Sequence, residues 1–417
     1  MKPEMYLITK EFPYGPAEDT FVKPEYPYLC EKYDVTIVVT ESGKNREAEQ
    51  EEGNVSMVSV RQNVFDKAFS FIRFLGEKDC YTEIASIIKE GKHVGKRIFR
   101  ALMFGTAAET FYRRLKKSIA LHKNTKALFY FYWFDYKCFG LTMHRHKFPD
   151  IRIIARTHGC DLYDERELYG KQFFQPQMDV SLDKLIFAAQ YARNYYLKRY
   201  QKKNIEKYPL CRLGVSGKEV MCGQRRTEQE KAPGFLLLSC SHAVGIKRIE
   251  LIIDGLSTVK TRNVKWVHIG GGECLKGLQE AAKQKLESKK NIQYRFTGAL
   301  SNSEVLEFYR QNYVGCFITT TQTEGGSPVA VQEALSFGIP VIATAVGELS
   351  QMVNDNGILL SINPDKEEVG RAIEKMIALF GTDAYFSMCQ NSLEIFEEKF
   401  NAEKNFSGFV KELEELI

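Results

Sequence analysis

The chain has 417 residues and a formal net charge of +5, with 44% apolar and 27% charged residues. The length predicts two or three domains, and the composition is that of a soluble globular protein. The modest charge gives no reason to expect a nucleic-acid partner. Ten cysteines without a CxxC pair argue against disulfides and zinc, and no apolar run reaches the roughly 18 residues of a membrane span. We therefore expect a cytoplasmic protein with no signal peptide and no transmembrane helix.

The first half of the chain alternates short apolar strands with helical segments. The strands that we expect are Met5–Ile8, Val35–Val39, Ala127–Trp133, Ile151–Ala155 and Leu185–Ala189. Helices are expected over residues 60–125 and over Gln190–Tyr200. This alternation predicts βαβ units with a parallel sheet.

The helical region 60–125 carries a strong excess of basic residues. Within residues 89–123, only Glu90 and Glu109 oppose the basic side chains of Lys89, Lys92, Lys96, Arg97, Arg100, Arg113, Arg114, Lys116, Lys117 and Lys123. Apolar residues such as Ile98 and Phe99 are interleaved with them. A basic amphipathic helix can lie on an anionic membrane. The alternative is an ordinary solvated helix face, and both interpretations stay open.

A polar segment, residues 216–233, separates the two halves of the chain. It contains Gly217, Gly223, Pro233 and the pair Arg225–Arg226, which is typical of an interdomain linker. We therefore expect one domain over residues 1–215, a second over 234–395 and a last helix over 396–417. The strands of the second domain are expected at Phe235–Ser239, Val264–Ile269, Tyr294–Phe296, Cys316–Ile318, Val341–Thr344 and Ile358–Leu360.

The stretch from Cys316 to Val346 combines a strand, a Gly-rich loop, a helix and a second strand. Ser327 suits the N-cap of this helix, Pro328 its first position, and Gly338 its end. At such a helix start, main-chain N–H groups have no partner within the helix and the helix dipole is positive.

The loop before this helix has the residues of an anion site. Gly325 and Gly326 let the backbone approach a ligand closely, and the free N–H groups of Val329 and Ala330 can bind a phosphate or diphosphate. Two carboxylates, Glu324 and Glu333, flank the loop and accept hydrogen bonds, as recognition of ribose and sugar hydroxyls requires. The alternative is a plain βαβ turn with two solvated glutamates.

This stretch resembles the donor-site signature of retaining GT-B glycosyltransferases of family 4. The residues that match in order are Glu324, Gly325, Gly326, Pro328, Glu333, Ala334, Gly338, Pro340 and Val341. The chain has eight residues between the two glutamates, where the signature usually has seven. The resemblance spans nearly the whole chain and several motifs.

The resemblance implies an α/β protein of the GT-B class, with two Rossmann-like doubly wound domains that face a central cleft. Its last helix would pack back on the N-terminal, acceptor-side domain. The implied reaction moves a sugar from a nucleotide-diphosphate sugar to a glycan or lipid-linked acceptor, with retention of configuration, in surface polysaccharide biosynthesis. No cofactor is implied beyond this co-substrate, and the absence of a DxD pair argues against a metal. The protein would work in the cytoplasm, peripherally at the inner face of the cell membrane.

The resemblance also implies roles for residues on the donor side. Lys247 matches a lysine that holds the donor diphosphate, while His242 stands where the family has an arginine and Arg248 could compensate for it. Gly15 matches a glycine loop near the donor phosphate, and the backbone of Gly298–Ala299 would receive the nucleotide base. The donor set is completed by Glu324, Gly325, Gly326, Ser327, Pro328, Val329, Ala330 and Glu333.

On the acceptor side, the resemblance singles out the segment that follows strand Ile151–Ala155. His158 matches a histidine that faces the transferred sugar, and Asp161 and Tyr163 would help to bind the acceptor. With Lys247 and Glu324, His158 forms the expected catalytic set.

Three alternatives remain open from the sequence. A GT-B-fold nucleotide-sugar epimerase would need no acceptor. A non-catalytic scaffold of polysaccharide assembly would be compatible with His242 and with the longer glutamate spacing. An NAD oxidoreductase is the most distant, because Gly270–Gly271–Gly272 does not complete a dinucleotide fingerprint.

Overall fold

The computed structural model describes residues 2–15, 18, 21–40, 54–57, 64–216, 234–261 and 263–416. The chain divides into two compact units, one of residues 1–212 with 406–417 and the other of residues 213–405. We call them unit 1 and unit 2. The predicted linker over 216–233 lies outside the described residues, apart from Ser216.

Unit 1 is built on a six-stranded sheet in the order β3-β2-β1-β4-β5-β6, with every pair of neighbours parallel. Its strands are β1 Glu4–Thr9, β2 Asp34–Val39, β3 Asn54–Met57, β4 Leu128–Phe131, β5 Arg152–Thr157 and β6 Lys184–Phe187. The apolar runs named above predicted all of these except β3, whose sequence is only four residues long and half polar. Continuous apolar runs are typical of parallel strands, because both faces of the sheet are covered.

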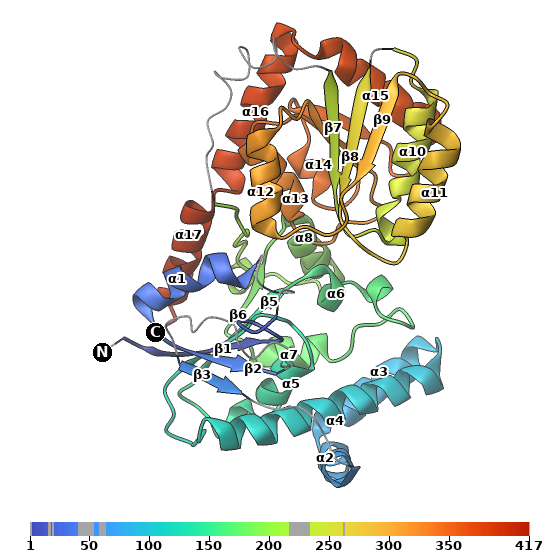
Figure 1. Ribbon diagram of the computed structural model, residues 1–417. Coiled ribbons are helices and arrows are strands. Elements are labelled where there is room, and N and C mark those ends of the chain that lie inside the picture. The colour runs from blue at the N-terminus through green and yellow to red at the C-terminus, as the bar shows by residue number, and fades with distance from the viewer. Residues whose placement is uncertain are drawn as a thin grey trace. The chain divides into compact units, whose positions relative to one another are not determined.

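Helices cover both faces of this sheet (Figure 1). One face packs against α1 Val22–Lys32 and the end of α17 Ala402–Glu414. The other face packs against a larger group of helices: α2 Val64–Leu75, α3 Lys78–Glu90, α4 Val94–Ser118, α5 Tyr136–Thr142, α6 Gly159–Leu162, α7 Gln175–Ser181 and α8 Gln190–Arg199. Unit 1 is therefore a three-layer α/β/α domain.

The helices α2, α3 and α4 each expose an apolar stripe. On α2, Phe65 is 86% exposed and lies on the same side as Phe69 and Ile72, at helical spacing. On α4, the exposed Phe99 and Met103 are also one turn apart. Such side chains are unusual on three neighbouring helices of a soluble domain and are a candidate contact surface.

The basic excess of this region is only partly on the surface. Arg97 is 4% exposed and donates to Glu90, to the Tyr169 carbonyl and to the Gly170 carbonyl. The prediction that Arg97 belongs to a solvent- or membrane-facing row is therefore wrong, because its guanidinium holds the α6–α7 segment against α4. Lys92 and Lys96 do lie on the surface.

A buried ion pair joins the layers of unit 1. Arg156 on β5 is fully buried and its Nη2 atom lies 2.6 Å from Oε2 of Glu25 on α1. Its Nε atom donates to the Tyr130 hydroxyl at 2.7 Å, and that hydroxyl donates to Oε1 of Glu25 at 2.9 Å. The guanidinium also lies 4.5 Å from the ring centre of Phe409 on α17. Each charge is thus paired and hydrogen-bonded, which buried charges require.

Unit 2 repeats the same architecture with the sheet order β12-β11-β10-β7-β8-β9, again with every pair of neighbours parallel. Its strands are β7 Phe235–Cys240, β8 Val264–Ile269, β9 Ile292–Phe296, β10 Cys316–Thr319, β11 Val341–Thr344 and β12 Gly357–Leu360. All six were predicted. Two doubly wound parallel sheets confirm the predicted fold class.

Two helical layers enclose the sheet of unit 2 (Figure 1). One layer consists of α10 Ile249–Thr258, α11 Leu275–Leu286 and α15 Lys366–Leu379. The other consists of α12 Asn302–Gln311, α13 Val329–Ser336, α14 Leu349–Met352 and part of α16 Asp383–Lys399.

The end of the chain differs from the prediction of one helix over 396–417. Helix α16 continues to Lys399, and a new helix, α17, begins at Ala402. Between them, Val215 and Asn401 form a parallel bridge and the Val215 N–H donates to the Phe400 carbonyl at 3.0 Å. The helix breaks there because the chain pairs with Val215. None of the described helices combines the length and the apolar character that a bilayer crossing needs.

We expect Glu25→Ala to lower the free energy of unfolding of unit 1 by about 3–5 kcal/mol, because it leaves the Arg156 charge buried and unpaired. Hydrogen exchange of the β5 amides measures this loss within unit 1. The matched control is Glu414→Ala, which removes an ion pair with Lys32 whose side chains are 45% and 54% exposed. This control should change stability by less than about 1 kcal/mol. Equal effects of the two variants would contradict a special role for the buried pair.

Candidate functional site

The Gly-rich loop of unit 2 connects β10 to α13 and ends one residue later than predicted. Pro328 occupies the N-cap, with φ −68° and ψ 109°, and α13 begins at Val329. The Pro328 carbonyl accepts from the N–H groups of Val331 and Gln332 at 3.1 and 3.2 Å. The N–H groups of Val329 and Ala330 precede these bonds at the helix start, and their binding of a ligand stays a prediction.

Ser327 therefore does not have the predicted N-cap position. Its hydroxyl instead accepts from Nε2 of Gln332 at 2.7 Å, and the side chain is buried. This bond fixes the loop to the first turn of α13. The Gly326 Cα has open space around it, because an added Cβ would have no atom within 4 Å.

Lys247 and Glu324 meet beside this helix start. Lys247 closes the short 3₁₀ helix Gly245–Lys247 after β7, and Glu324 follows β10. Because β7 and β10 are parallel neighbours, their following loops lie at the same edge of the sheet. The Nζ atom of Lys247 lies 2.7 Å from Oε2 of Glu324, and both side chains keep partial contact with solvent. The structure thus brings together two of the three predicted catalytic residues.

Arg248 has a different environment from the one that a diphosphate ligand would need. Its Nε atom donates to the Thr320 carbonyl at 2.8 Å, and Nη2 donates to the carbonyls of Thr321 and Ile362 at 3.0 Å each. The guanidinium therefore ties the β10–α13 loop to the segment after β12. Arg248 positions the loop, and its predicted donor contact stays a prediction.

Glycine Gly347, which the sequence analysis did not single out, lies against the backbone of Glu324. Its φ is +54°, and a Cβ atom there would lie 1.7 Å from the Glu324 carbonyl oxygen. Only glycine permits this approach without displacement of the loop. A second close approach surrounds His242, since Cβ atoms on Gly270 and Gly272 would lie 1.9 and 2.5 Å from the carbonyls of Ser241 and Ala243. The triple glycine was visible in the sequence, but its packing role was not.

The predicted base site is a bend stabilised by main-chain bonds. Gly298 has φ +77°, and its carbonyl accepts from the Gly270 N–H at 2.9 Å. Ala299 lies beside Gly271. The Ala243 N–H group donates to the Gly271 carbonyl at 2.8 Å, which holds the segment after β7 beside the loop after β8. His242 lies in this segment, and its side chain is exposed.

Glu333 on α13 is a buried carboxyl, with only 4% of its surface exposed. Nδ2 of Asn302 donates to its Oε1 atom at 2.5 Å. Burial raises the pKa of Glu333 to about 7, and the bond from Asn302 opposes this rise. Its second oxygen is left to accept from a ligand hydroxyl, which fits the predicted role in hydroxyl recognition.

In unit 1, His158 lies at the carboxyl end of β5 and precedes α6. Its ring centre is 4.2 Å from the ring of Trp133, which follows β4, and 5.2 Å from that of Tyr132. Trp133 in turn donates its indole N–H to Glu18, whose carboxylate also accepts from the N–H groups of Glu11 and Phe12 at 2.7 and 2.8 Å. Trp133 and Glu18 are site residues that sequence reasoning missed.

The predicted acceptor residues Asp161 and Tyr163 have structural contacts. Asp161 accepts from the N–H groups of His158 at 2.6 Å and Phe134 at 2.9 Å, so both carboxylate oxygens are used. Tyr163 is 2% exposed and packs on Tyr195 with ring centres 4.8 Å apart. This burial argues against a direct acceptor contact for Tyr163, and Asp161 holds His158 in place.

Gly15 lies in the loop after β1, where a Cβ atom would be 2.3 Å from a carboxylate oxygen of Glu11. The glycine is therefore needed for packing within the loop. Its predicted donor contact stays a prediction.

Unit 2 is similar to a known family of proteins. Residues 224–386 match the family model "Glycosyl transferases group 1". This range contains the β10–α13 loop with Lys247, Glu324 and Glu333, so these residues lie within the part of the chain that is similar to that family. A relative described as an uncharacterized glycosyltransferase of Methanocaldococcus jannaschii is 26% identical over 290 residues, which is 68% of this chain and 74% of the relative.

Solved structures similar to this chain cover nearly its whole length. Anabaena HepE in complex with UDP has a TM-score of 0.67 at 12% identity, covering 99% of this chain and 100% of that one. Sucrose-phosphate synthase of Thermosynechococcus elongatus has a TM-score of 0.69 at 14% identity, covering 100% and 99%. WaaG, a glycosyltransferase involved in lipopolysaccharide biosynthesis, has 0.58 at 13%, covering 94% and 95%. These likenesses confirm the predicted GT-B fold class.

We expect Glu333→Gln to stabilise unit 2 at alkaline pH and to have no effect near pH 4. The folded-state pKa of Glu333, about 7, exceeds the ordinary value of 4.5. The free energy of unfolding of unit 2 therefore falls as pH rises between these two values, because the unfolded chain releases the proton first. The full loss corresponds to about 3 kcal/mol above pH 7. Calorimetric melting at pH 5 and pH 8 measures it, with the exposed Glu307→Gln as the control. A melting temperature of the Glu333 variant that does not rise relative to wild type at pH 8 would refute this expectation.

Proposed function

We propose that this protein is a glycosyltransferase that moves a sugar from a nucleotide-diphosphate sugar to a glycan or lipid-linked acceptor. The observation that carries the proposal is the position of the Lys247 ammonium group beside Glu324 and the Gly-rich loop that leads to α13. The group 1 match over this loop supports it. Among the structural neighbours, HepE was solved with UDP and with UDP-glucose, which supports a nucleotide sugar as co-substrate.

The proposed chemistry follows from where charge develops. Cleavage of the bond between the anomeric carbon and the diphosphate leaves negative charge on the diphosphate. Lys247 and the N–H groups of Val329 and Ala330 would stabilise that charge with preorganised positive groups. Since these groups supply fixed positive charge, we propose that the step proceeds without a metal.

The carboxylates would recognise the two sugars of the donor. Glu333 would accept from the ribose hydroxyls through the oxygen that Asn302 does not use. Glu324 would exchange its bond to Lys247 for hydroxyls of the transferred sugar. The bend at Gly298–Ala299 would receive the base, and the imidazole of His158 would contact a sugar.

We further propose retention of configuration, by front-face attack of the acceptor hydroxyl. In that step the acceptor oxygen bonds to the anomeric carbon, the diphosphate leaves, and a phosphate oxygen of the donor takes the acceptor proton. The product would be a glycan of a surface polysaccharide. An epimerase would instead convert the donor without an acceptor, and a non-catalytic scaffold would release no nucleoside diphosphate.

We expect Lys247→Ala and Glu324→Ala each to lower donor-dependent release of nucleoside diphosphate by at least roughly a hundredfold, as for loss of one preorganised contact. The donor is first selected by thermal shift with UDP-glucose, UDP-N-acetylglucosamine and GDP-mannose. A ligand that binds the native state raises the melting temperature of the protein. The matched control is Lys276→Ala, on the exposed side of α11.

Three outcomes would oppose this mechanism. Wild-type turnover of the Lys247 variant would remove that residue from the reaction. Conversion of the donor without any acceptor would favour the epimerase. Failure of the wild-type protein to release nucleoside diphosphate from every donor that binds would favour the scaffold.

We also propose that unit 1 contacts an anionic membrane through α2 and α4, and that the protein works in the cytoplasm at the inner face of the cell membrane. The exposed apolar residues Phe65, Ile72, Phe99 and Met103 would enter the interface, and exposed lysines such as Lys96 would pair with lipid headgroups. The solvated-face alternative explains the lysines but gives no reason for the exposed aromatic rings.

Replacement of Phe65, Ile72, Phe99 and Met103 by Ser should weaken binding to vesicles of phosphatidylglycerol and phosphatidylcholine by at least about tenfold. Each buried apolar side chain contributes on the order of 1.5–3 kcal/mol to such binding. Vesicle co-sedimentation measures the change, with Ile205→Ser and Ile362→Ser as exposed apolar controls from elsewhere in the chain. Unchanged sedimentation of the fourfold variant would favour the solvated helix face.

A further inference from the structure

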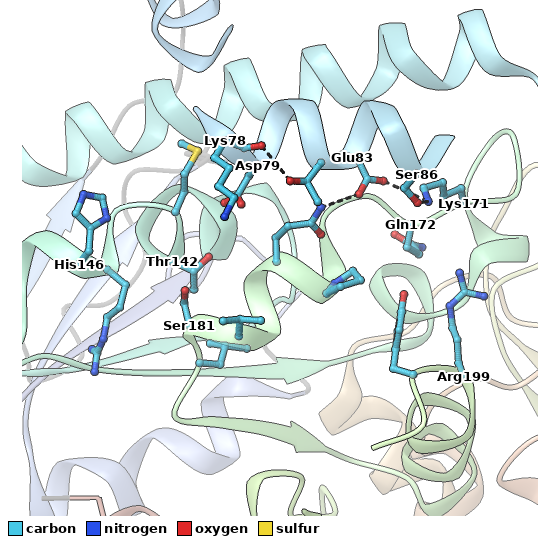
Figure 2. A pocket seen from close by; sticks show the side chains of 18 of the residues that line it. Lys78, Asp79, Glu83, Ser86, Thr142, His146, Lys171, Gln172, Ser181 and Arg199 are labelled. Atoms are coloured by element: carbon cyan, nitrogen blue, oxygen red, sulfur yellow. Dashed lines mark hydrogen bonds and ion pairs between the residues drawn. The ribbon is translucent and has the colours of Figure 1, made fainter. Parts of the chain in front are cut away.

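Unit 1 contains a pocket of about 890 Å³ that none of the proposed donor or catalytic residues lines. Its walls come from α3, from the residues after α5, from α7 and from the end of α8 (Figure 2). Its volume lies in the range of small-molecule sites, roughly 300–1,000 Å³.

Two buried acceptor atoms in the pocket wall can accept further hydrogen bonds. Glu83 on α3 is 3% exposed and receives a bond from Nε2 of Gln177 on α7 at 3.0 Å, through Oε2. Its other oxygen, Oε1, forms an ion pair with the Lys171 ammonium group at 3.3 Å and has a second lone pair for a ligand. The Oε1 atom of Gln177 lacks a partner. A buried acceptor without a partner is costly, and a ligand with hydroxyl groups would satisfy it.

The charges around the pocket favour a neutral ligand. Four cationic and four anionic side chains line it: Lys78, Arg145, Lys171 and Arg199, with Asp79, Glu83, Glu90 and Asp183. Three of the cations already have carboxylate partners, since Arg145 lies 3.5 Å from Asp183, Lys171 lies 2.5 Å from Glu90, and Arg199 pairs with Asp164. A phosphate or carboxylate ligand would have to break these pairs.

The arrangement of the polar groups fits a sugar. Glu83, Ser86 and Lys171 gather at one end of the pocket, and His146 lies at the other (Figure 2). Carboxylate and amide oxygens accept from hydroxyls. The Lys171 ammonium group donates to Ser86 and to Glu90 and lies 3.3 Å from Glu83, so it holds this end of the pocket together. Met143, Pro176 and Leu182 add apolar surface for the faces of sugar rings.

We propose that this pocket is a carbohydrate-binding subsite, and that it takes a neutral saccharide of two or three units. Hydroxyl groups of the saccharide donate to Oε1 of Gln177 and to Oε1 of Glu83, which keeps its contact with Lys171. The saccharide is held by contacts of unit 1 alone.

The pocket is connected to the segment that follows His158. Gln172 lines the pocket, and its Nε2 atom donates to the carbonyls of Cys160 at 2.8 Å and Tyr163 at 3.0 Å. Its N–H group donates to Asp164 at 2.8 Å. A saccharide in the pocket therefore touches a residue that is bonded to α6. If the proposed function holds, this saccharide is the distal part of the acceptor glycan; the binding itself does not depend on that function.

The test uses the full-length protein and four disaccharides as probes: cellobiose, maltose, N,N′-diacetylchitobiose and α-1,3-mannobiose. Saturation-transfer difference NMR measures their binding. Thr82 lies exposed at the pocket wall on α3, so Thr82→Trp should fill the entrance and weaken binding at least tenfold. Ala85→Trp places the same ring on an exposed position of α3 outside the pocket and should leave affinity within twofold.

A second variant tests the acceptor atoms without blocking the pocket. Gln177→Met preserves the length of the side chain but removes both polar atoms, and we expect binding at least tenfold weaker. The variant also loses the bond from Nε2 to the buried Glu83, so we expect a lower melting temperature, and binding is measured well below it. The inference is overturned if none of the four disaccharides binds the wild-type protein, or if Thr82→Trp binds them as tightly as Ala85→Trp does.

Two further measurements distinguish an acceptor site from an independent saccharide site, and failure of the subsite from failure of the proposed function. A bound disaccharide that competes with acceptor in the transfer assay identifies the pocket as part of the acceptor site, and one that leaves turnover unchanged identifies an independent saccharide site. Turnover without disaccharide binding would overturn the subsite alone. Disaccharide binding without release of nucleoside diphosphate would overturn the proposed function alone.

Discussion

Parallel strand pairing is the constraint on which both units depend. In a parallel sheet, the loops that follow the strands all emerge at one edge, whatever their separation in the sequence. This is why Lys247 and Glu324, 77 residues apart, form an ion pair: they follow the neighbouring strands β7 and β10. The same constraint in unit 1 gathers Trp133 and His158 after β4 and β5. The order of the strands in each sheet thus determines which residues of the candidate site lie close together.

Much of the fold could be predicted because parallel strands are buried on both faces. Their sequences are then continuous apolar runs, as in Val341–Thr344, where the predicted and observed bounds are identical. The failures occur where tertiary contacts override local preference. Strand β3 has only four residues, two of them polar, and the break between α16 and α17 depends on pairing with Val215, which lies far away in the sequence.

The candidate site was predictable in its residue types and less so in their roles. Glu333 and the N–H groups of Val329 and Ala330 lie as local sequence grammar suggested. Arg248 and Asp161 are instead engaged by backbone groups, because a charged side chain near a loop can satisfy main-chain atoms as readily as a ligand. Gly347 could not have been chosen from the sequence, since its value lies in a close approach to Glu324, which precedes it by 23 residues. The pocket under α3 likewise arises from segments that share no local motif.

The bond between Lys247 and Glu324 has a consequence for ligand discrimination. Without a ligand, the ammonium group is already neutralised by its neighbour, so a small inorganic anion gains little by entering and must compete with a carboxylate at 2.7 Å. A ligand that carries both a diphosphate and hydroxyl groups can take the lysine and compensate the released carboxylate in a single event. The pair would thereby act as a filter against free phosphate, which is abundant in every cell, in favour of molecules that present both chemistries at once.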